Sequence, residues 1–201
     1  MRASTTLPQG YTSKHTIDLT KDRHLQVQLS IGSLILFIVF GLLFWAAAIR
    51  LGNYSGSNGR LTLTLPLLLL GLLALVLLSA IVILLHEGLH GICYLFFTRS
   101  RPVFGFKGLY AYAAAPGWYI PRPQFIVTGL APLIVLSLLG LIVMPILPIS
   151  LLPALVFSLT VNASGAVGDM YMIWITLRQP AKTLVLDFGD GITFYTRGYT
   201  S

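Results

Sequence analysis

Charged residues and cross-linking residues are scarce in this sequence. Lys, Arg, Asp and Glu together make up 9% of the 201 residues, whereas a soluble globular domain has about 25%. Glutamate occurs once, and the single cysteine, Cys93, excludes an intrachain disulfide. Hydrophobic residues, in contrast, make up 56% of the chain. This composition excludes an ordinary soluble domain and is typical of a protein embedded in a lipid bilayer.

The net charge of +7 does not indicate nucleic-acid binding. The Lys and Arg residues flank apolar segments and form no basic face along the chain. A nucleic-acid-binding protein gathers its positive charge in one patch. We therefore expect no nucleic-acid partner.

Four segments are long and apolar enough to cross a bilayer, which takes about 20 helical residues. The fold class that we expect is an all-α polytopic membrane protein with four transmembrane helices, at residues 29–49, 66–97, 124–147 and 149–177. The second segment is too long for a simple crossing and must tilt, project or break. The expected membrane domain, residues 29–177, separates an N-terminal tail (1–28) from a C-terminal tail (178–201).

Basic residues predict the orientation of these spans. An even number of spans places both tails and the connection 98–123 on one side, with 11 of the 13 Lys and Arg residues. The opposite side has only Arg50 and Arg60. Because Lys and Arg are enriched in cytoplasmic loops, we expect a multi-pass protein of the cell membrane with both termini in the cytoplasm.

Short β segments are expected outside the helices. Residues 16–20 alternate like a strand, and residues 103–112 are aromatic and extended. Near the C-terminus, residues 183–188 and 192–196 flank Gly189-Asp190-Gly191. An Asp-Gly pair between two alternating runs is a strong hairpin signal. We therefore predict a cytoplasmic β-hairpin in the C-terminal tail.

The only glutamate, Glu87, lies in the second apolar segment, within His86-Glu87-Gly88-Leu89-His90. On a helix this H-E-x-x-H spacing places two imidazoles on one face, where they can share a zinc ion, and positions the glutamate to activate a water molecule there. In the alternative interpretation, Glu87 pairs with a buried basic residue, but the apolar spans contain no Lys or Arg. The motif therefore predicts His86 and His90 as metal ligands and Glu87 as the general base.

Asp169 is the second acidic residue within the predicted spans. His90 lies nine residues before Arg99, and Asp169 lies nine residues before Arg178. Both groups should therefore sit roughly 13 Å from the same membrane surface, at 1.5 Å per residue. Two histidines and one aspartate at equal depth form a three-ligand zinc site with an open fourth position. The alternatives are a capping or packing role for Asp169 and a ligand role for Cys93.

Asn162 lies seven residues before Asp169, on the same helical face. Its amide can donate to a developing oxyanion, or it can join two helices by hydrogen bonding. We retain it as a candidate catalytic residue with both alternatives open. Gly165 and Gly168 are expected to permit close approach of the fourth span to the second.

The chain resembles the site-2 protease family of intramembrane zinc metalloproteases. The resemblance is carried by His86 to His90 in a membrane helix, Gly129-Leu-Ala-Pro132 at the next span, and Asn162 followed by Gly168-Asp169. More specifically, it is similar to a group of small four-span zincin peptidases. The resemblance implies His86 and His90 as ligands, Glu87 as catalytic base and Asp169 as third ligand. The chain departs from the site-2 pattern of an Asn-Pro element and an Asp-Gly pair, because Asn162 lacks a following proline and Asp169 is followed by Met170.

These patterns predict an intramembrane metallopeptidase that uses Zn²⁺. Its partners would be the lipid bilayer and a membrane-protein or peptide substrate, which it would cleave near the cytoplasmic leaflet. The alternative is a catalytically inactive metal-binding membrane protein that binds partner helices. A zinc transporter is disfavoured because the outer halves of the spans are almost entirely Leu, Ile, Val and Gly, whereas transport needs a polar path through the bilayer.

Overall fold

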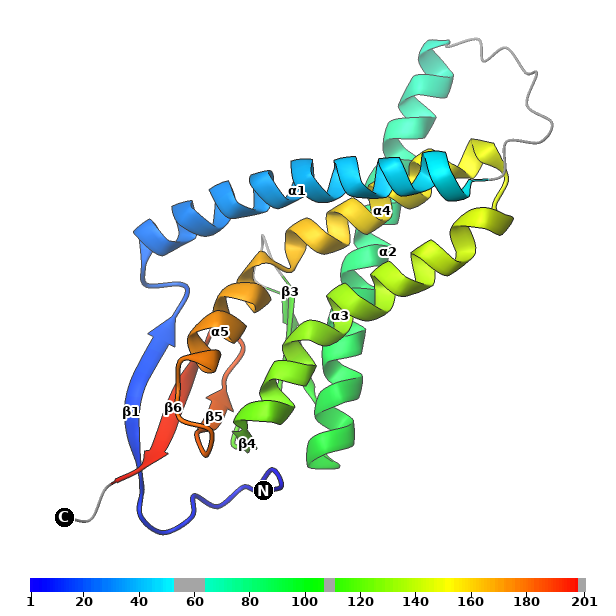
Figure 1. Cartoon of the computed structure of the whole chain (residues 1–201). Coiled ribbons are helices and arrows are strands. Elements are labelled where there is room, and N and C mark those ends of the chain that lie inside the picture. The colour runs from blue at the N-terminus through cyan, green and yellow to red at the C-terminus, as the bar shows by residue number, and fades with distance from the viewer. Residues whose placement is uncertain (53–63, 107–110, 199–201) are drawn as a thin grey trace.

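The structure, a computed structural model, describes residues 1–52, 64–106 and 111–198. The helices form an elongated bundle, and the strands collect at one end of it (Figure 1). The helices are α1 (Arg23–Leu51), α2 (Leu65–Thr98), α3 (Arg122–Val143), the short 3₁₀ helices η1 (Met144–Ile146) and η2 (Ile149–Leu151), α4 (Leu152–Gly165) and α5 (Val167–Leu177). Among the described residues, three helices are long and apolar enough to cross a membrane, and the bent pair α4–α5 makes a fourth candidate if it counts as one span.

Local capping explains where the first helices begin and end. The Asp22 carboxylate accepts a hydrogen bond of 3.0 Å from the Leu25 backbone N–H, so α1 begins six residues before the predicted span. Helix α2 is continuous across Gly88 and Gly91 and ends where Arg99 adopts a left-handed conformation. Its 34 residues extend about 51 Å. The helix therefore does not break and is too long for the bundle, so its N-terminal turns project beyond the other helices (Figure 1).

The fourth predicted span is broken in the structure. Helices α4 and α5 meet at an angle of 40°, with Ala166 between them and its N–H bonded to the Asn162 carbonyl at 3.1 Å. The sequence around the break, Ser164-Gly165-Ala166-Val167-Gly168, contains two glycines, which weaken a helix interior. The break gives α5 its own first turn, and this turn contains Asp169.

Segments from both ends of the chain form one antiparallel sheet. Its strands are β1 (Tyr11–Asp18), β6 (Gly191–Arg197), β5 (Leu184–Asp187) and β4 (Tyr119–Pro121), in that spatial order. The β5–β6 pairing confirms the predicted C-terminal hairpin. The predicted strand 16–20 is wrong in its limits, because β1 covers residues 11–18 to match the length of β6. A separate hairpin joins β2 (Val103–Phe106) to β3 (Ala111–Ala114); residues 107–110 of the predicted 103–112 strand lie outside the described residues.

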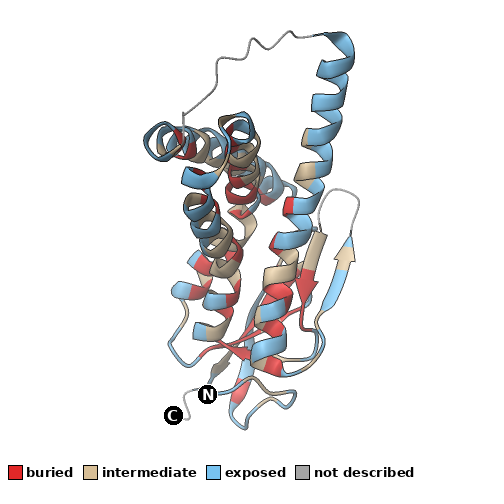
Figure 2. Ribbon diagram, turned by 90° about the vertical axis from the view of Figure 1, so that its right-hand side faces the viewer, coloured by how far each residue is buried: buried red, intermediate tan, exposed pale blue. Residues whose placement is uncertain are grey.

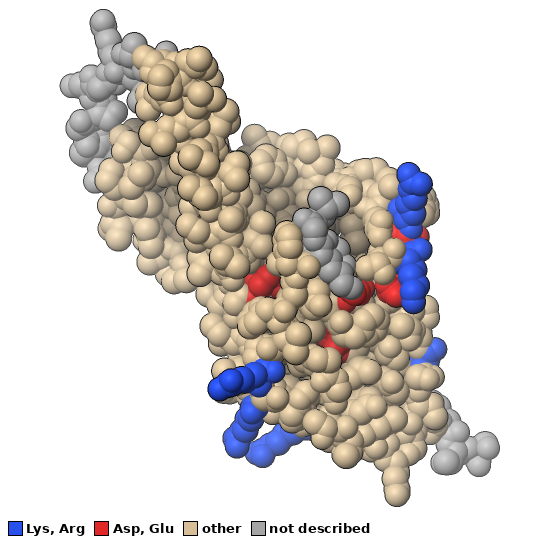
Figure 3. Space-filling model, turned by 180° about the vertical axis from the view of Figure 1, so that it is seen from behind, with Lys and Arg blue, Asp and Glu red and all other residues tan. Residues whose placement is uncertain are grey.

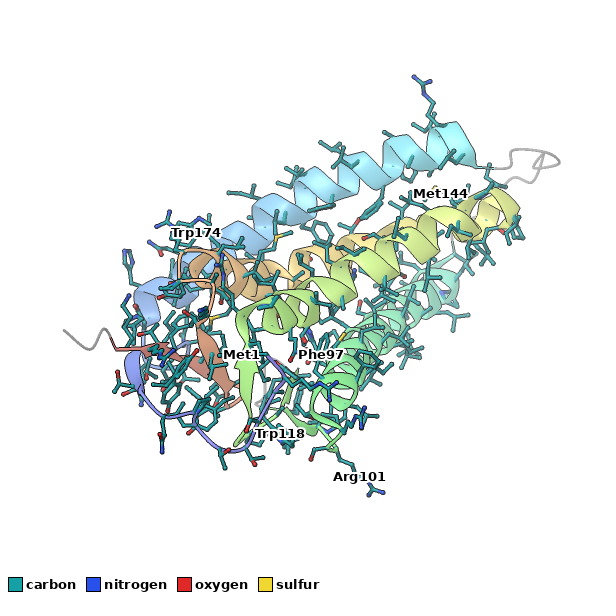
Figure 4. All side chains as sticks on the ribbon, turned by 60° about the horizontal axis from the view of Figure 1, so that its bottom comes forward. Met1, Phe97, Arg101, Trp118, Met144 and Trp174 are labelled. Carbon is teal, nitrogen blue, oxygen red and sulfur yellow. The ribbon has the colours of Figure 1, made fainter. Side chains whose placement is uncertain are left out.

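The buried side chains form two clusters at opposite ends of the bundle. One lies between the sheet and the nearby helix ends and includes Ile120, Val185 and Phe194. The other joins α1, α4 and the end of α3, and includes Phe44 and Met144. Figure 4 shows Met144 at the end of the bundle opposite Arg101 and Trp118.

Much of the helix surface is exposed, drawn pale blue in Figure 2, and many of the exposed helix residues are large and apolar. Leu42, Leu84 and Ile142 are 68%, 70% and 68% exposed. On the face in Figure 3, the Lys and Arg side chains lie toward the sheet end and the start of α1, whereas the projecting part of α2 is uncharged. An apolar surface of this extent requires an apolar partner, either lipid or protein.

Candidate metal centre

Helix α2 positions both histidines of the H-E-x-x-H motif on one face. His86 and His90 are buried, and their rings lie edge to face with centroids 4.9 Å apart. This arrangement follows from the spacing of four residues, which places side chains one above the other on a helix. The two Nε2 atoms point toward the same neighbouring helix.

That neighbour is α5, which contributes Asp169. Its Oδ2 atom lies 3.1 Å from His86 Nε2 and 3.4 Å from His90 Nε2. The three residues form a group whose candidate ligand atoms all lie within 4.8 Å of one another. The structure therefore brings together the three residues that the sequence predicts as ligands.

Hydrogen bonds fix the orientation of both imidazoles. His90 Nδ1 lies 2.9 Å from the Thr128 backbone carbonyl of α3. A carbonyl only accepts, so His90 Nδ1 donates this bond and its Nε2 is the ring atom that faces Asp169. His86 Nδ1 lies 2.9 Å from Asn162 Oδ1 of α4, and the Asn162 amide donates to the Pro132 carbonyl at 3.3 Å. That second bond orients the Asn162 oxygen toward His86, so His86 Nδ1 donates to it and His86 Nε2 is the ring atom that faces Asp169.

The spacing of these atoms fits a zinc ion. Zinc bonds of about 2.0–2.1 Å in a tetrahedron place neighbouring ligand atoms roughly 3.3 Å apart. The distances from the Asp169 oxygen to the two imidazole nitrogens, 3.1 and 3.4 Å, bracket that value. Two imidazoles and one carboxylate are a donor set typical of catalytic zinc, which keeps a fourth position open. The chemistry and the geometry of the group therefore agree.

Glu87 lies beside this group without belonging to it. Its side chain is half-buried and lines the same cavity as the three predicted ligands. The backbone N–H of Ala113 in β3 approaches its carboxylate. A carboxylate that faces the cavity but does not join the ligand group is placed as a general base requires.

Two hollows meet at the site. The larger, of about 210 Å³, extends from the predicted ligands toward the sheet and is lined by residues of α2, α3, α5, β3 and the β5–β6 turn. The smaller, of about 130 Å³, lies between α2 and α4 and is lined by Val82, Ile83 and Val161. His86, Glu87 and Gly165 line both. The site therefore opens toward the strands on one side and toward the apolar helix surfaces on the other.

The remaining sequence candidates have other surroundings. Both ends of the Asn162 amide form hydrogen bonds to neighbouring helices. This is the geometry expected of a residue that joins helices, one of its two predicted roles. Its other role, as an oxyanion donor, stays a prediction. Cys93 is half-buried and is not among the grouped residues. A Cβ atom on Gly165 or Gly168 would contact nothing within 4 Å, so the predicted close approach at these glycines is wrong. They line the larger cavity instead.

Three further groups that position the histidines or line the cavity were not identified from the sequence. The Thr128 carbonyl is a backbone group, which residue types do not reveal. Tyr94 lies one turn after His90 on the same face of α2, a spacing that the sequence does contain. Its hydroxyl donates to Asp187, which follows 93 residues later in β5. Burial raises the pKa of Asp187 to about 6, because it disfavours the charged carboxylate.

This site defines a class of protein. Two histidines and an aspartate beside a cavity-facing glutamate are the groups with which zinc hydrolases hold the metal and activate water. A family described as "Putative zincin peptidase" matches residues 79–184, slightly more than half of the chain, and the chain belongs to this zinc peptidase family. No curated protein and no solved structure matches the chain. The family match includes the three predicted ligands and Glu87 but ends before Asp187.

Proposed function

We propose that the protein is an intramembrane zinc metallopeptidase of the site-2-protease type, with His86, His90 and Asp169 holding the metal. The observation that carries this proposal is the convergence of these three residues beside Glu87 on helices whose outer surfaces are apolar. The family match independently supports a zinc peptidase. Its substrate would be a membrane protein or a membrane-bound peptide.

Insertion in a bilayer is supported by where apolar and basic side chains lie. The exposed apolar surfaces belong to helices that pass the length and composition criteria for membrane spans. Near the sheet end, Trp174 is 50% exposed, and the Arg178 guanidinium lies 3.6 Å from the centre of its ring. Exposed tryptophan and arginine at helix ends are characteristic of the membrane–water boundary. In this proposal the sheets and both termini lie in the cytoplasm of a multi-pass membrane protein.

Each side chain of the site has a distinct task in peptide hydrolysis. Bound zinc would polarise the scissile carbonyl and acidify water. Glu87 accepts the proton from the attacking water and delivers it to the leaving amine. Asn162 and the Thr128 carbonyl hold the two imidazoles in the tautomers that free their Nε2 atoms.

An extended substrate can be held by the edge of β3. Strand β3 pairs with β2 and lines the larger cavity with Ala111, Tyr112 and Ala113. Backbone pairing with a strand edge is a common way to bind extended peptides. A helical substrate hides its peptide bonds, so such pairing would also expose the bond that is cut. The smaller apolar hollow would then receive the membrane-embedded part of the substrate, and the larger cavity its cytoplasmic part.

The first test is the zinc content of the purified, detergent-solubilised protein, measured by elemental mass spectrometry. Wild type should contain about one zinc per chain, and Asp169→Ala and His90→Ala should lose it. Cys93→Ala is the matched control, because Cys93 lies on the same helix outside the ligand group. Absence of zinc from folded wild type would refute the metallopeptidase. Zinc-loaded protein that cleaves no membrane substrate would support the inactive metal-binding alternative.

A further inference from the structure

The larger cavity extends well beyond the atoms that the proposed mechanism uses. From the predicted ligands it continues past Tyr94 to the β5–β6 turn, where Asp187, Gly189 and Gly191 form its wall. Tyr94 is 3% exposed and Asp187 is 8% exposed. The mechanism has no task for either side chain, and Asp187 lies outside the part of the chain that matches the family.

The Asp187 carboxylate is held in a fixed position at this end of the cavity. Its Oδ2 accepts from the Tyr94 hydroxyl, and its Oδ1 accepts from the Gly189 N–H at 2.8 Å. An ionised carboxylate can accept about four hydrogen bonds, so acceptor capacity remains on both oxygens. The turn that carries it is closely packed and requires glycine: Gly189 has a φ of +91°, and a Cβ on Gly191 would lie 2.0 Å from the Ile17 carbonyl oxygen. The acid is therefore built into the wall.

The charges around the cavity do not balance. Its described lining includes three carboxyl groups, on Glu87, Asp169 and Asp187, and no Lys or Arg. The two charges of a divalent cation at the histidines would compensate Asp169 and Glu87. Asp187 is then a buried carboxylate whose hydrogen-bond partners, a hydroxyl and an amide, are neutral. Buried charges in proteins are normally paired, so a cation from outside the described lining would provide the missing partner of Asp187.

The lining of the larger cavity also includes large apolar side chains. They are those of Leu19, Phe125, Met172 and Ile192. A Lys or Arg side chain has an apolar stem and a charged tip, and it packs its stem on apolar surface while placing the tip at a polar group. The cavity offers that combination, and the acid lines it without lining the smaller apolar hollow.

We infer that this end of the cleft, formed by Asp187 and Tyr94, binds a Lys or Arg side chain of the substrate on the cytoplasmic side of the scissile bond. The inference rests on the proposed function and defines its substrate class. Segments that follow a membrane span on the cytoplasmic side are enriched in Lys and Arg. The proposed orientation places the Asp187 end of the cleft toward that segment. Substrate specificity would thus come from Asp187 in β5, whereas catalysis would come from residues within the part of the chain that matches the family.

Binding of designed peptides tests the inference without hydrolysis. The probes are peptides with one apolar membrane span and a cytoplasmic flank that differs at a single position, carrying Lys, Gln or Glu. Zinc-loaded Glu87→Gln protein in detergent should bind the Lys peptide about 10- to 100-fold more tightly than the Gln peptide, the range for a hydrogen bond to a charged group. The Glu peptide should bind weakest. Fluorescence anisotropy of labelled peptides measures all three.

The decisive variant adds Asp187→Asn, which retains an oxygen for the Tyr94 hydroxyl but removes the charge. The Lys peptide should then bind no better than the Gln peptide. Asp18→Asn is the matched control, because Asp18 lies on β1 outside the cavity lining and pairs with Lys21; the Lys preference should persist. Zinc content and elution volume verify that each variant is folded.

Equal affinity for the Lys and Gln peptides, no measurable binding of the Lys peptide, or a Lys preference that survives Asp187→Asn would each overturn the inference. Failure of the proposed function gives a different result. If wild type cleaves none of the peptides that the Glu87→Gln protein binds, the hydrolase proposal fails while the Lys preference can stand. If wild type cleaves the Lys and Gln peptides equally, the hydrolase stands and the inference falls.

Discussion

Asn162→Ala should weaken zinc binding although Asn162 is not itself a predicted ligand. Asn162 is 2% exposed, and its Oδ1 accepts from His86 Nδ1 at 2.9 Å. Without this acceptor the buried imidazole N–H loses its partner, and the ring can rotate or change tautomer. Either change removes the Nε2 lone pair from the position opposite Asp169. The variant therefore tests the effect of orienting His86, while all three predicted ligands are retained.

The expected size of the effect follows from two independent estimates. Removing a hydrogen-bond partner of a metal-bound histidine lowers metal affinity by about 10- to 100-fold, which corresponds to roughly 1.4–2.8 kcal/mol. A buried donor left without a partner costs about 1–3 kcal/mol. The two ranges agree, so we expect the zinc Kd to rise by one to two orders of magnitude.

Competition with a zinc-binding dye in detergent measures this change. Asn162→Asp should retain much of the affinity, because a carboxylate also accepts from His86 Nδ1. It should nevertheless unfold at lower temperature, because it cannot donate to the Pro132 carbonyl. Ser164→Ala, a buried change on the same helix, controls for packing and should leave the Kd unchanged. A wild-type Kd in Asn162→Ala would refute the reasoning that His86 depends on this hydrogen bond.

Three further predictions concern the cleft. Glu87→Gln should retain about one zinc per chain, but its rate of hydrolysis should fall by about 10²- to 10⁴-fold, the range for loss of a general base. Elemental analysis measures the zinc, and peptide cleavage measures the rate. An unchanged cleavage rate would show that Glu87 is not the general base. Gly165→Val should place methyl groups where the two hollows meet, so peptide affinity should fall at least tenfold while zinc content stays at the wild-type value; loss of both together would contradict a purely steric effect. The Lys preference should fade as the pH falls through about 6, because burial raises the pKa of Asp187 to that value against the lowering effects of the Tyr94 hydroxyl and the Gly189 N–H. The ratio of Lys to Gln peptide affinity between pH 5 and 8 tests this, and a constant ratio would mean that another group binds the Lys side chain.

The helices were predictable because long apolar runs leave few alternatives. The limits of α2, Leu65 and Thr98, differ by one residue from those predicted. Helix α1 begins earlier than its apolar run because a side-chain cap, not hydrophobicity, sets its start. The break between α4 and α5 was not predicted, since hydropathy continues across residue 166 while the backbone hydrogen bonds change.

The convergence of His86, His90 and Asp169 was predictable from helix geometry and from the basic residues that end each span. The groups that orient them were harder to identify. The Thr128 carbonyl is invisible to any search for residue types, and Asp187 reaches Tyr94 only because β5 pairs within a sheet assembled from distant segments. Pairing between strands so far apart depends on tertiary packing, which alternation within one segment does not encode.

The pairing of β1 with β6 has a consequence for how the protein is made. Strand β1 ends at Asp18 and its partner begins at Gly191, so a ribosome must add about 170 residues before the two can meet. At about 5–20 residues per second, the newly made β1 waits roughly 10–35 seconds without its partner. The cleft wall that carries Asp187 is completed only in that last interval. Asp169 precedes Asp187 by only 18 residues, so a growing chain would complete its ligand group and its cleft wall within about 1–4 seconds of each other at this rate.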